Sequence, residues 1–301
     1  MMVHLYRGGR VILLERFDVE KVLDLVEREK VTFLNLVPTM LIRLISHPDI
    51  GNYNLENLKT IMYAGAPIAL SKIQEAMRKL GDHRFYTGLG STEASGSILS
   101  FPNKEHAMEG PMAEKLSSVG RESINVEVRV VDSEGKDVTV GAIGEVIAKG
   151  ANIALGYWKL PEETAEIFKD GWLYTGDMAK VDSEGYVYIV DRKKDMIISG
   201  GENISSREVE EVIFHYPAVQ EVAVIGVPDE EWGEAVKAVV ALSPGSVATE
   251  AELIDFCKVR LASYKKPRSV DFIEELPKNA AGKIDKGSLR RFYREKYKRK
   301  E

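Results

Sequence analysis

The chain has little cysteine: its 301 residues include only Cys257. A single cysteine excludes a disulfide framework and is typical of a reducing compartment, so we expect a cytoplasmic protein. Cys257 lies between Leu253 and Leu261 at i, i+4 spacing, which predicts that the three side chains share one helix face in the core. The five histidines are scattered without the spacing of metal ligands.

Long apolar runs are also lacking. No stretch approaches the roughly 20 apolar residues of a membrane-spanning helix, and no signal peptide is visible, so we predict no transmembrane segment. The net charge of −6 gives no indication of nucleic-acid binding. With 44% hydrophobic and 29% charged residues, the composition is that of a globular protein, and the length suggests about two domains.

The first part of the chain alternates strand and helix signals. Asp18 is a candidate N-cap for a helix with apolar residues on one face. Such alternation is typical of a parallel sheet flanked by helices, in which ligands bind at the C-terminal ends of the strands. Two glycine-bearing segments, 65–67 and 88–91, fall at such ends. We expect strands over 31–37, 59–64 and 84–87, and helices over 39–46 and from a Ser71-x-x-Gln74 capping box to Gly81.

After about residue 119 the pattern changes to short strands with hairpin turns, which predicts a small antiparallel sheet or barrel. A compact α+β unit follows, with helices capped at Ser205 and Thr249. The predicted fold class is therefore α/β: the remnant of a parallel-sheet large domain, a small β subdomain and an α+β C-terminal domain. The predicted boundaries are a partial α/β sheet at 1–118, a β-rich subdomain at 119–190, a hinge at 191–194 and a mobile C-terminal domain at 195–301.

Tyr86-Thr-Gly-Leu-Gly-Ser-Thr-Glu93 is a candidate phosphate-binding segment. A strand that ends in Gly-x-Gly presents free backbone N–H groups, which suit a phosphate. Thr92 adds a hydroxyl donor, and Glu93 adds a hard oxygen ligand for Mg²⁺. Taken alone, such a segment is more often an ordinary glycine turn.

Thr175-Gly-Asp177 is a more specific signal. A carboxylate at a fixed turn can accept hydrogen bonds from both ribose hydroxyls of a nucleotide. The alternative is a local Asx turn without a ligand. By residue type alone, Lys193 and Lys194 are typical of a solvated turn, and Lys283 of a surface lysine.

Read in order, three segments resemble the motifs of the adenylate-forming ligases, which include acyl-CoA synthetases, luciferases and peptide-synthetase adenylation domains. The segments are Thr175-Gly-Asp177, Asp191-Arg-Lys-Lys-Asp-Met-Ile-Ile-Ser-Gly-Gly-Glu-Asn-Ile204 and Pro277-Lys-Asn-Ala-Ala-Gly-Lys283. Upstream, residues 90–93 match the last four positions of the family's Tyr-Gly-x-Thr-Glu motif, and 63–67 resemble its turn along the adenine edge. The resemblance covers the chain from about Arg7 onward.

The resemblance implies roles for individual residues. At Leu89 the family usually has an aromatic ring against adenine, so we expect weaker stacking here. The implied catalytic residues are Lys283, Thr92 and Glu93, with Glu93 also the metal ligand. The implied nucleotide-binding residues are Gly65, Ala66, Pro67, Leu89, Gly90, Ser91, Thr92, Asp177 and Arg192. Ser199, Gly200 and Gly201 would border the CoA channel, and Lys194 would be the hinge between the domains.

The activity implied is that of an ATP-dependent, AMP-forming acyl-CoA ligase, with ATP, Mg²⁺ and CoA used as substrates. A carboxylic acid displaces pyrophosphate from ATP, and a thiol then displaces AMP, with the C-terminal domain rotating between the steps. A long-chain or other fatty acid is the first choice of substrate, and an aryl acid is the alternative.

The family's phosphate loop should lie upstream of the first matching residues. We therefore expect a chain that lacks this part and is impaired in isolation. The expected partners are an N-terminal chain, which would complete a split enzyme, or further copies of this chain in a homo-oligomer. The alternative is a non-catalytic or split-enzyme subunit that binds adenylate or a partner chain.

Overall fold

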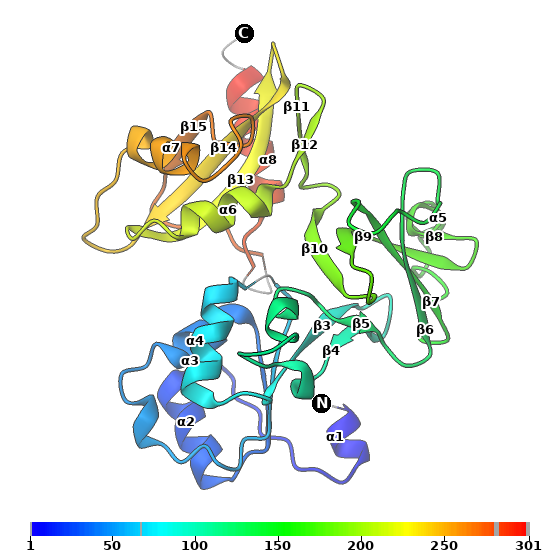
Figure 1. Ribbon diagram of the computed structural model, residues 1–301, viewed down its shortest axis with the longest axis vertical. Coiled ribbons are helices and arrows are strands. Elements are labelled where there is room, and N and C mark those ends of the chain that lie inside the picture. The colour runs from blue at the N-terminus through cyan, green and yellow to red at the C-terminus, as the bar shows by residue number, and fades with distance from the viewer. Residues whose placement is uncertain (1, 67, 280–282, 299–301) are drawn as a thin grey trace. The chain divides into compact units, whose positions relative to one another are not determined.

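The structure of the protein, a computed structural model, describes residues 2–66, 68–279 and 283–298 (Figure 1). The chain divides into two compact units, one of residues 1–89 and 100–117 and the other of residues 90–99 and 118–301. Three sheets of five strands each, flanked by helices, confirm the predicted α/β class, and within the described residues none of the sheets closes into a barrel. No helix in this part of the chain is long and apolar enough to cross a bilayer.

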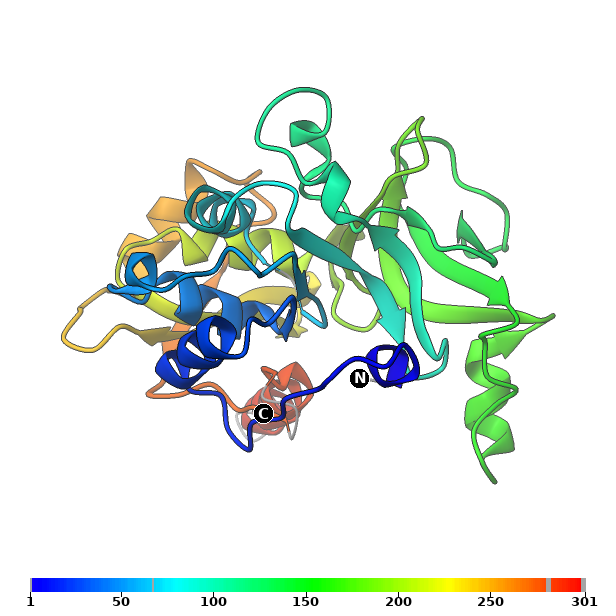
Figure 2. The same ribbon diagram turned by 90° about the horizontal axis from the view of Figure 1, so that it is seen from below.

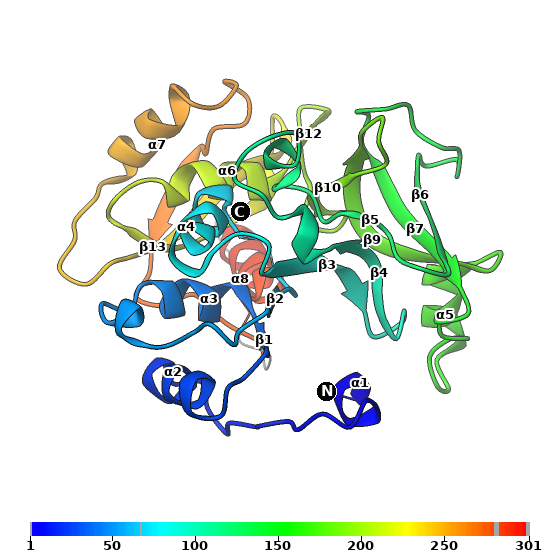
Figure 3. The same ribbon diagram turned by 60° about the horizontal axis from the view of Figure 1, so that its bottom comes forward.

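The first unit contains the parallel strands that the sequence predicts. β1 pairs with β2, and β2 with β3, all in parallel. The Asp18 carboxylate accepts a hydrogen bond from the Lys21 backbone N–H at 3.0 Å, which confirms the predicted N-cap. α3 and α4 pack side by side (Figure 3). The elements are α1 (Met2–Tyr6), α2 (Val19–Arg28), β1 (Phe33–Leu36), α3 (Pro38–Ile45), β2 (Thr60–Tyr63), α4 (Leu70–Leu80) and most of β3 (Phe85–Ser91).

Two local predictions in this region are wrong. The capping box at Ser71 does not form, because α4 begins at Leu70 and its N-cap is Ala69, whose side chain makes no capping bond. Nor does β3 end at the Gly-x-Gly segment: the strand continues to Ser91, and the turn follows it. Gly90 permits this, since a Cβ there would collide with the carbonyl oxygen of Gly96 on the returning strand. The predicted end of α4 is confirmed, with Gly81 at φ +92°.

A buried aromatic cluster forms the centre of the first unit. Phe85, Phe101 and His106 are fully buried, and the His106 ring lies 4.5 Å from the Phe101 ring. The Tyr63 hydroxyl and His106 Nε2 are hydrogen-bonded at 3.0 Å. Burial lowers the pKa of His106 from 6.5 to about 4, so the ring is neutral at pH 7.

This buried imidazole makes the first unit sensitive to acid. Between pH 6.5 and about 4 the unfolded chain binds a proton at His106 and the folded chain does not. The free energy of unfolding is therefore undiminished above this window and decreases as the pH falls through it. We expect a loss of about 2 kcal/mol between pH 7 and pH 5. Hydrogen exchange of peptides from β2 and β3, corrected for the pH dependence of the intrinsic exchange rate, measures this loss of stability. A His106→Gln variant with an unchanged pH dependence would contradict this prediction.

The second unit begins with an antiparallel sheet. Its strands run in the order β10-β9-β7-β6, with β8 paired to β9. Both predicted hairpin turns form: the Gly135 N–H donates to Asp132 and the Gly185 N–H to Asp182, each at 3.1 Å to the backbone oxygen. α5 packs against β8 and β9 (Figure 2). Most of β4 (Gly96–Phe101) and β5 (Arg121–Glu122) also belong to this unit, although both are strands of the sheet that contains β1–β3. The other elements are β6 (Val126–Val131), β7 (Gly144–Gly150), α5 (Pro161–Ile167), β8 (Phe168–Lys169), β9 (Trp172–Val181) and β10 (Val187–Arg192).

The C-terminal part of this unit is a sheet covered by helices on both faces. Alternate residues of β13 pack on α6 and α7 or on α8, which explains why this strand is apolar almost throughout. The capping bonds of Ser205 and Thr249 form as predicted, and Cys257 is buried in the core. The elements are β11 (Ile197–Ser199), β12 (Glu202–Ile204), α6 (Ser206–Phe214), β13 (Val219–Asp229), β14 (Gly233–Leu242), α7 (Glu250–Lys258), β15 (Ser269–Phe272) and α8 (Lys286–Lys298).

Candidate active site

Asp177 and Arg192 face each other across two antiparallel strands. Their Cα atoms are direct partners in the register of β9 and β10, and Arg192 Nε lies 2.9 Å from Asp177 Oδ1. Asp177 is 7% exposed, whereas the Arg192 side chain is 53% exposed. Burial raises the pKa of Asp177, and the charge of Arg192 opposes this effect. The pair therefore presents a constrained carboxylate beside an accessible guanidinium.

The turn before Asp177 is fixed by hydrogen bonds. The Thr175 hydroxyl donates to the Val146 carbonyl at 2.8 Å and accepts from the Asp177 N–H at 3.1 Å. Gly176 has φ +71°, a conformation that favours glycine. Its N–H donates to Glu145 Oε1 at 3.1 Å. The Thr-Gly-Asp segment is therefore more than a local Asx turn, because a second strand holds it in place.

Glu145 and Lys193 are two residues of this cluster that the sequence did not reveal. Lys193 Nζ lies 2.8 Å from Glu145 Oε2, and the Lys193 N–H donates to the Gly176 carbonyl at 2.8 Å. Lys193 lies in an exposed turn, as its residue type predicts, and in addition pairs with Glu145. The available signal was Glu145 itself, a charged residue in the otherwise largely apolar segment of β7, but its partner lies 48 residues away.

Glu93 lies in the turn between β3 and β4, in the second unit with Asp177 and Arg192. The Tyr157 hydroxyl donates a hydrogen bond to Glu93 Oε1 at 2.6 Å. This bond is the largest cause of a lowered pKa of Glu93, to which the charge of Arg192 also contributes, and it raises the pKa of Tyr157 to about 12. Glu93 therefore lies within electrostatic range of Arg192, and we refer to Glu93, Arg192 and Asp177 as the charged cluster.

The remaining predicted nucleotide-binding residues divide between the two units. Gly90, Ser91 and Thr92 are exposed at the end of β3 in the second unit. In the first unit, Gly65 and Ala66 are exposed just after β2, with Gly65 at φ +90°, and Leu89 is partly buried in β3. Pro67 lies outside the described residues.

The residues predicted for the CoA channel form the turn between β11 and β12. Gly200 and Gly201 have φ values of +60° and +84°. The Gly200 N–H donates to the Trp232 carbonyl at 2.9 Å, and a Cβ at Gly200 would lie 2.5 Å from the Trp232 ring. A side chain at position 200 would therefore require the Trp232 ring to move, whereas Ser199 is buried in the strand.

Lys283 and Lys194 are both exposed in the second unit. The Lys283 N–H donates to Asn279 Oδ1 at 3.1 Å. Within the described residues, no hydrogen bond or ion pair joins the Lys283 ammonium to the charged cluster of Glu93, Arg192 and Asp177. The structure thus brings three of the predicted catalytic and nucleotide-binding side chains together and leaves this lysine apart from them.

The predicted hinge segment connects directly to a helix N-terminus. Asp191 is 6% exposed, and its Oδ2 accepts from the Ser206 N–H at 2.6 Å and from the Ser206 hydroxyl at 2.7 Å. Its other oxygen accepts from the Arg192 N–H at 2.8 Å. One buried carboxylate therefore links β10 to the start of α6.

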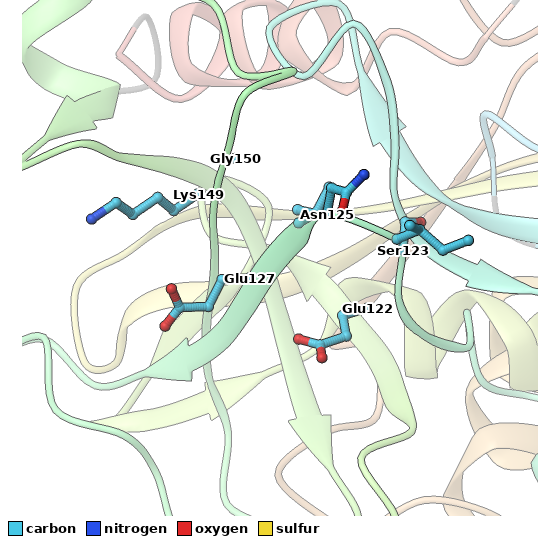
Figure 4. A pocket seen from close by; sticks show the side chains of 8 residues that line it. Glu122, Ser123, Asn125, Glu127, Lys149 and Gly150 are labelled. Atoms are coloured by element: carbon cyan, nitrogen blue, oxygen red, sulfur yellow. The ribbon is translucent and has the colours of Figure 1, made fainter.

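A shallow surface depression of about 600 Å³ lies apart from these residues, lined by Glu122–Glu127, Lys149 and Gly150. Figure 4 shows the Lys149 and Asn125 side chains pointing in opposite directions. Because its polar groups do not converge, this depression lacks the arrangement of a ligand site.

Comparison with known proteins gives the family. The model of the AMP-binding enzyme family matches residues 1–158, and the model of the AMP-binding enzyme C-terminal domain matches residues 208–283. These are the two regions that contain the α/β strands with the Glu93 turn and the Lys283 loop. The chain belongs to the AMP-binding enzyme family.

Individual relatives agree with this assignment. A feruloyl-CoA synthase of Amycolatopsis sp is 43% identical over 95% of this chain and 57% of its own length. A medium/long-chain-fatty-acid–CoA ligase of Mycobacterium tuberculosis is 41% identical over 94% of this chain and 50% of its own length. ATP-bound MatB from Rhodopseudomonas palustris has a solved structure with a TM-score of 0.88 and 36% identity, covering 98% of this chain and 57% of that chain. The chain thus spans about half the length of the curated relatives it matches.

The carboxylate of Asp177 should be required for nucleotide binding. Asp177→Asn removes the charged acceptor for ribose hydroxyls, and we expect AMP binding by calorimetry to weaken about 30-fold, or ~2 kcal/mol. Asp137→Asn is the matched control, because Asp137 pairs with Arg129 Nε at 2.7 Å on the same sheet. Equal AMP affinity in the two variants would exclude Asp177 as a nucleotide ligand.

Proposed function

We propose that this chain functions as an ATP-dependent, AMP-forming acid–CoA ligase. The observation that carries the proposal is the ion pair between Asp177 and Arg192, 2.9 Å across β9 and β10, with Glu93 close enough for Arg192 to lower its pKa. A ribose-binding carboxylate, a cation for the phosphate region and a hard oxygen ligand are the groups that binding of a nucleotide with its metal requires.

Each group has a chemical task in the proposed reaction. Asp177 accepts hydrogen bonds from the ribose hydroxyls of the nucleotide, and the exposed guanidinium of Arg192 binds the ribose or phosphate region of the same nucleotide. Oxygen ligands suit Mg²⁺, and Glu93 would contact it in the ATP complex with Thr92 beside it. The described residues hold no group of three or more side chains that could bind a metal by themselves, so phosphate oxygens and water would complete the coordination shell.

The proposed reaction has two steps. In the first, a carboxylate oxygen of the acid bonds to the α-phosphorus of ATP, and the bond to pyrophosphate breaks. In the second, the thiol of CoA loses its proton and its sulfur bonds to the acyl carbon, and AMP leaves with the bonding electron pair. The Lys283 ammonium would stabilise the charge that develops on the oxygens in the first step. The exposed turn at Gly200 would face the thiol in the second step, with Lys194 at the hinge.

We propose a fatty acid as the acid substrate, because one relative with 41% identity is named a medium/long-chain-fatty-acid–CoA ligase. An aryl acid is the second candidate, supported by the relative with 43% identity that is named a feruloyl-CoA synthase. Pyrophosphate release by the purified chain with ATP, Mg²⁺ and either octanoate, palmitate or ferulate tests both. Release with none of these acids, together with no binding of AMP, would contradict the proposed function.

Lys283 should act in the first step only. Lys283→Ala removes a cation that stabilises the transition state, so acid-dependent pyrophosphate release should fall about 100-fold, or ~3 kcal/mol. Thioester formation from a supplied acyl-adenylate should be retained. Lys278→Ala is the matched control, since Lys278 pairs with Glu221 at 2.9 Å. Equal losses in both steps would show that Lys283 has no step-specific role.

Gly200 should show the opposite pattern. Gly200→Ala places a Cβ against the Trp232 ring at a φ of +60°, which distorts the turn, so CoA-dependent AMP release should slow while pyrophosphate release is kept. Gly245→Ala is the control, because Gly245 has a positive φ of +79° with open space around it. A Gly200→Ala variant that forms the thioester at the normal rate would remove this turn from the proposed CoA channel.

A further inference from the structure

Tyr157 and Glu93 are 64 residues apart in sequence and are joined by a hydrogen bond of 2.6 Å from the phenol hydroxyl to Glu93 Oε1. We propose that Tyr157 is a positioning residue that orients the Glu93 carboxylate for Mg²⁺ in the ATP complex. This inference rests on the proposed function, in which Glu93 is the metal ligand, and assigns a residue that acts through it.

The Tyr157 backbone is itself held in place. Its N–H donates to Thr164 Oγ1 at 2.9 Å, and the Thr164 hydroxyl donates to the Leu160 carbonyl at 2.6 Å. Gly156, at φ +150°, lets the chain pass close to Thr164, because a Cβ there would lie 2.5 Å from the Thr164 methyl group. Phe168 packs edge-on against the Tyr157 ring with the centroids 6.0 Å apart. The phenol is therefore presented from a fixed base.

The turn that carries Glu93 is docked on the same segment. The Ala154 N–H donates to the Glu93 carbonyl at 2.7 Å, and the Asn152 amide donates to the Ala94 carbonyl at 2.8 Å. With the phenol bond, residues 152–157 hold the turn by three hydrogen bonds. Two of these bonds fix the backbone, and the third, from Tyr157, fixes the carboxylate.

The geometry of the carboxylate explains why this third bond matters. The phenol hydroxyl donates to Oε1, and the Ser91 side chain and the Glu93 N–H also hydrogen-bond to the carboxylate, so the orientation of the carboxylate is fixed. Mg²⁺ demands near-ideal octahedral geometry, so an oriented oxygen binds it better than a freely rotating one. Because the Tyr157 side chain is 38% exposed, packing in the core does not by itself explain where its ring lies. Hydrogen bonds to a ligating carboxylate are a known means of tuning metal affinity, and their loss typically costs 10- to 100-fold.

The test compares ATP binding by the 301-residue chain with Mg²⁺ and with EDTA, measured by calorimetry. Tyr157→Phe removes only the hydroxyl. We expect the Mg²⁺ concentration that gives half-maximal enhancement of ATP binding to rise about 10-fold, while ATP affinity in EDTA stays within about twofold of the original. Thr164→Val, which removes the acceptor for the Tyr157 N–H, should change the Mg²⁺ dependence in the same direction.

Tyr188→Phe is the matched control, because it removes a phenol bond of 3.0 Å to the carboxylate of Asp182 at the far end of the β9–β10 hairpin. It should leave both binding constants unchanged. Adding Tyr157→Phe to a Glu93→Ala chain should also change nothing, since the carboxylate that Tyr157 orients is then gone.

Three outcomes would overturn the proposal. Normal Mg²⁺ dependence in Tyr157→Phe would do so, as would an equal loss of affinity with and without Mg²⁺, which is the result of a purely structural role. An effect of Tyr157→Phe that persists in the Glu93→Ala chain would have the same meaning. Failure of the proposed function is recognised separately: the unsubstituted chain would then show no Mg²⁺ enhancement of ATP binding, and the premise that Glu93 meets the metal would fall with it.

Discussion

The candidate site depends on one electrostatic constraint, the burial of the Asp177 carboxylate beside a single half-exposed guanidinium. Taking a carboxylate out of water costs several kcal/mol of free energy, and an ion pair with a solvated partner offsets only part of this cost. The raised pKa of Asp177 shows that burial outweighs the charge of Arg192. In the proposed nucleotide complex, ribose hydroxyls would add hydrogen bonds to the Asp177 carboxylate.

The neighbouring residues can be understood as supports for that carboxylate. Thr175, Gly176 and Glu145 fix the turn that leads to it, and Lys193 neutralises Glu145 at 2.8 Å. In a strand, successive side chains point to opposite faces. Asp191 accordingly binds the N-terminus of α6, while its neighbour Arg192 pairs with Asp177. The predicted hinge segment 191–194 therefore contains both the carboxylate that binds the start of α6 and the guanidinium that pairs with Asp177.

Much of this arrangement could be predicted from the sequence because its signals are local. Apolar periodicity and caps such as Asp18 and Thr249 located the helices, and short motifs marked Asp177 and Glu93. The two wrong predictions were also local. Ser71 has the right spacing for a capping box but lies inside the helix, and the glycines at 88 and 90 continue a strand that they were expected to end. In both cases the residue types allow either conformation, helix cap or helix interior for Ser71 and turn or strand for the glycines. Tertiary packing determines which one is adopted.

The residues that sequence reasoning missed share a different property: their partners are distant. Tyr157 meets Glu93 across 64 residues, and Lys193 meets Glu145 across 48. No periodicity or motif encodes such pairs, because they exist only when the β-sheet of the second unit has formed. The same dependence has an energetic consequence. A ligand that binds only the native state stabilises that state, so the proposed nucleotide contacts with Asp177 and Glu93 would also stabilise the strands that hold these residues.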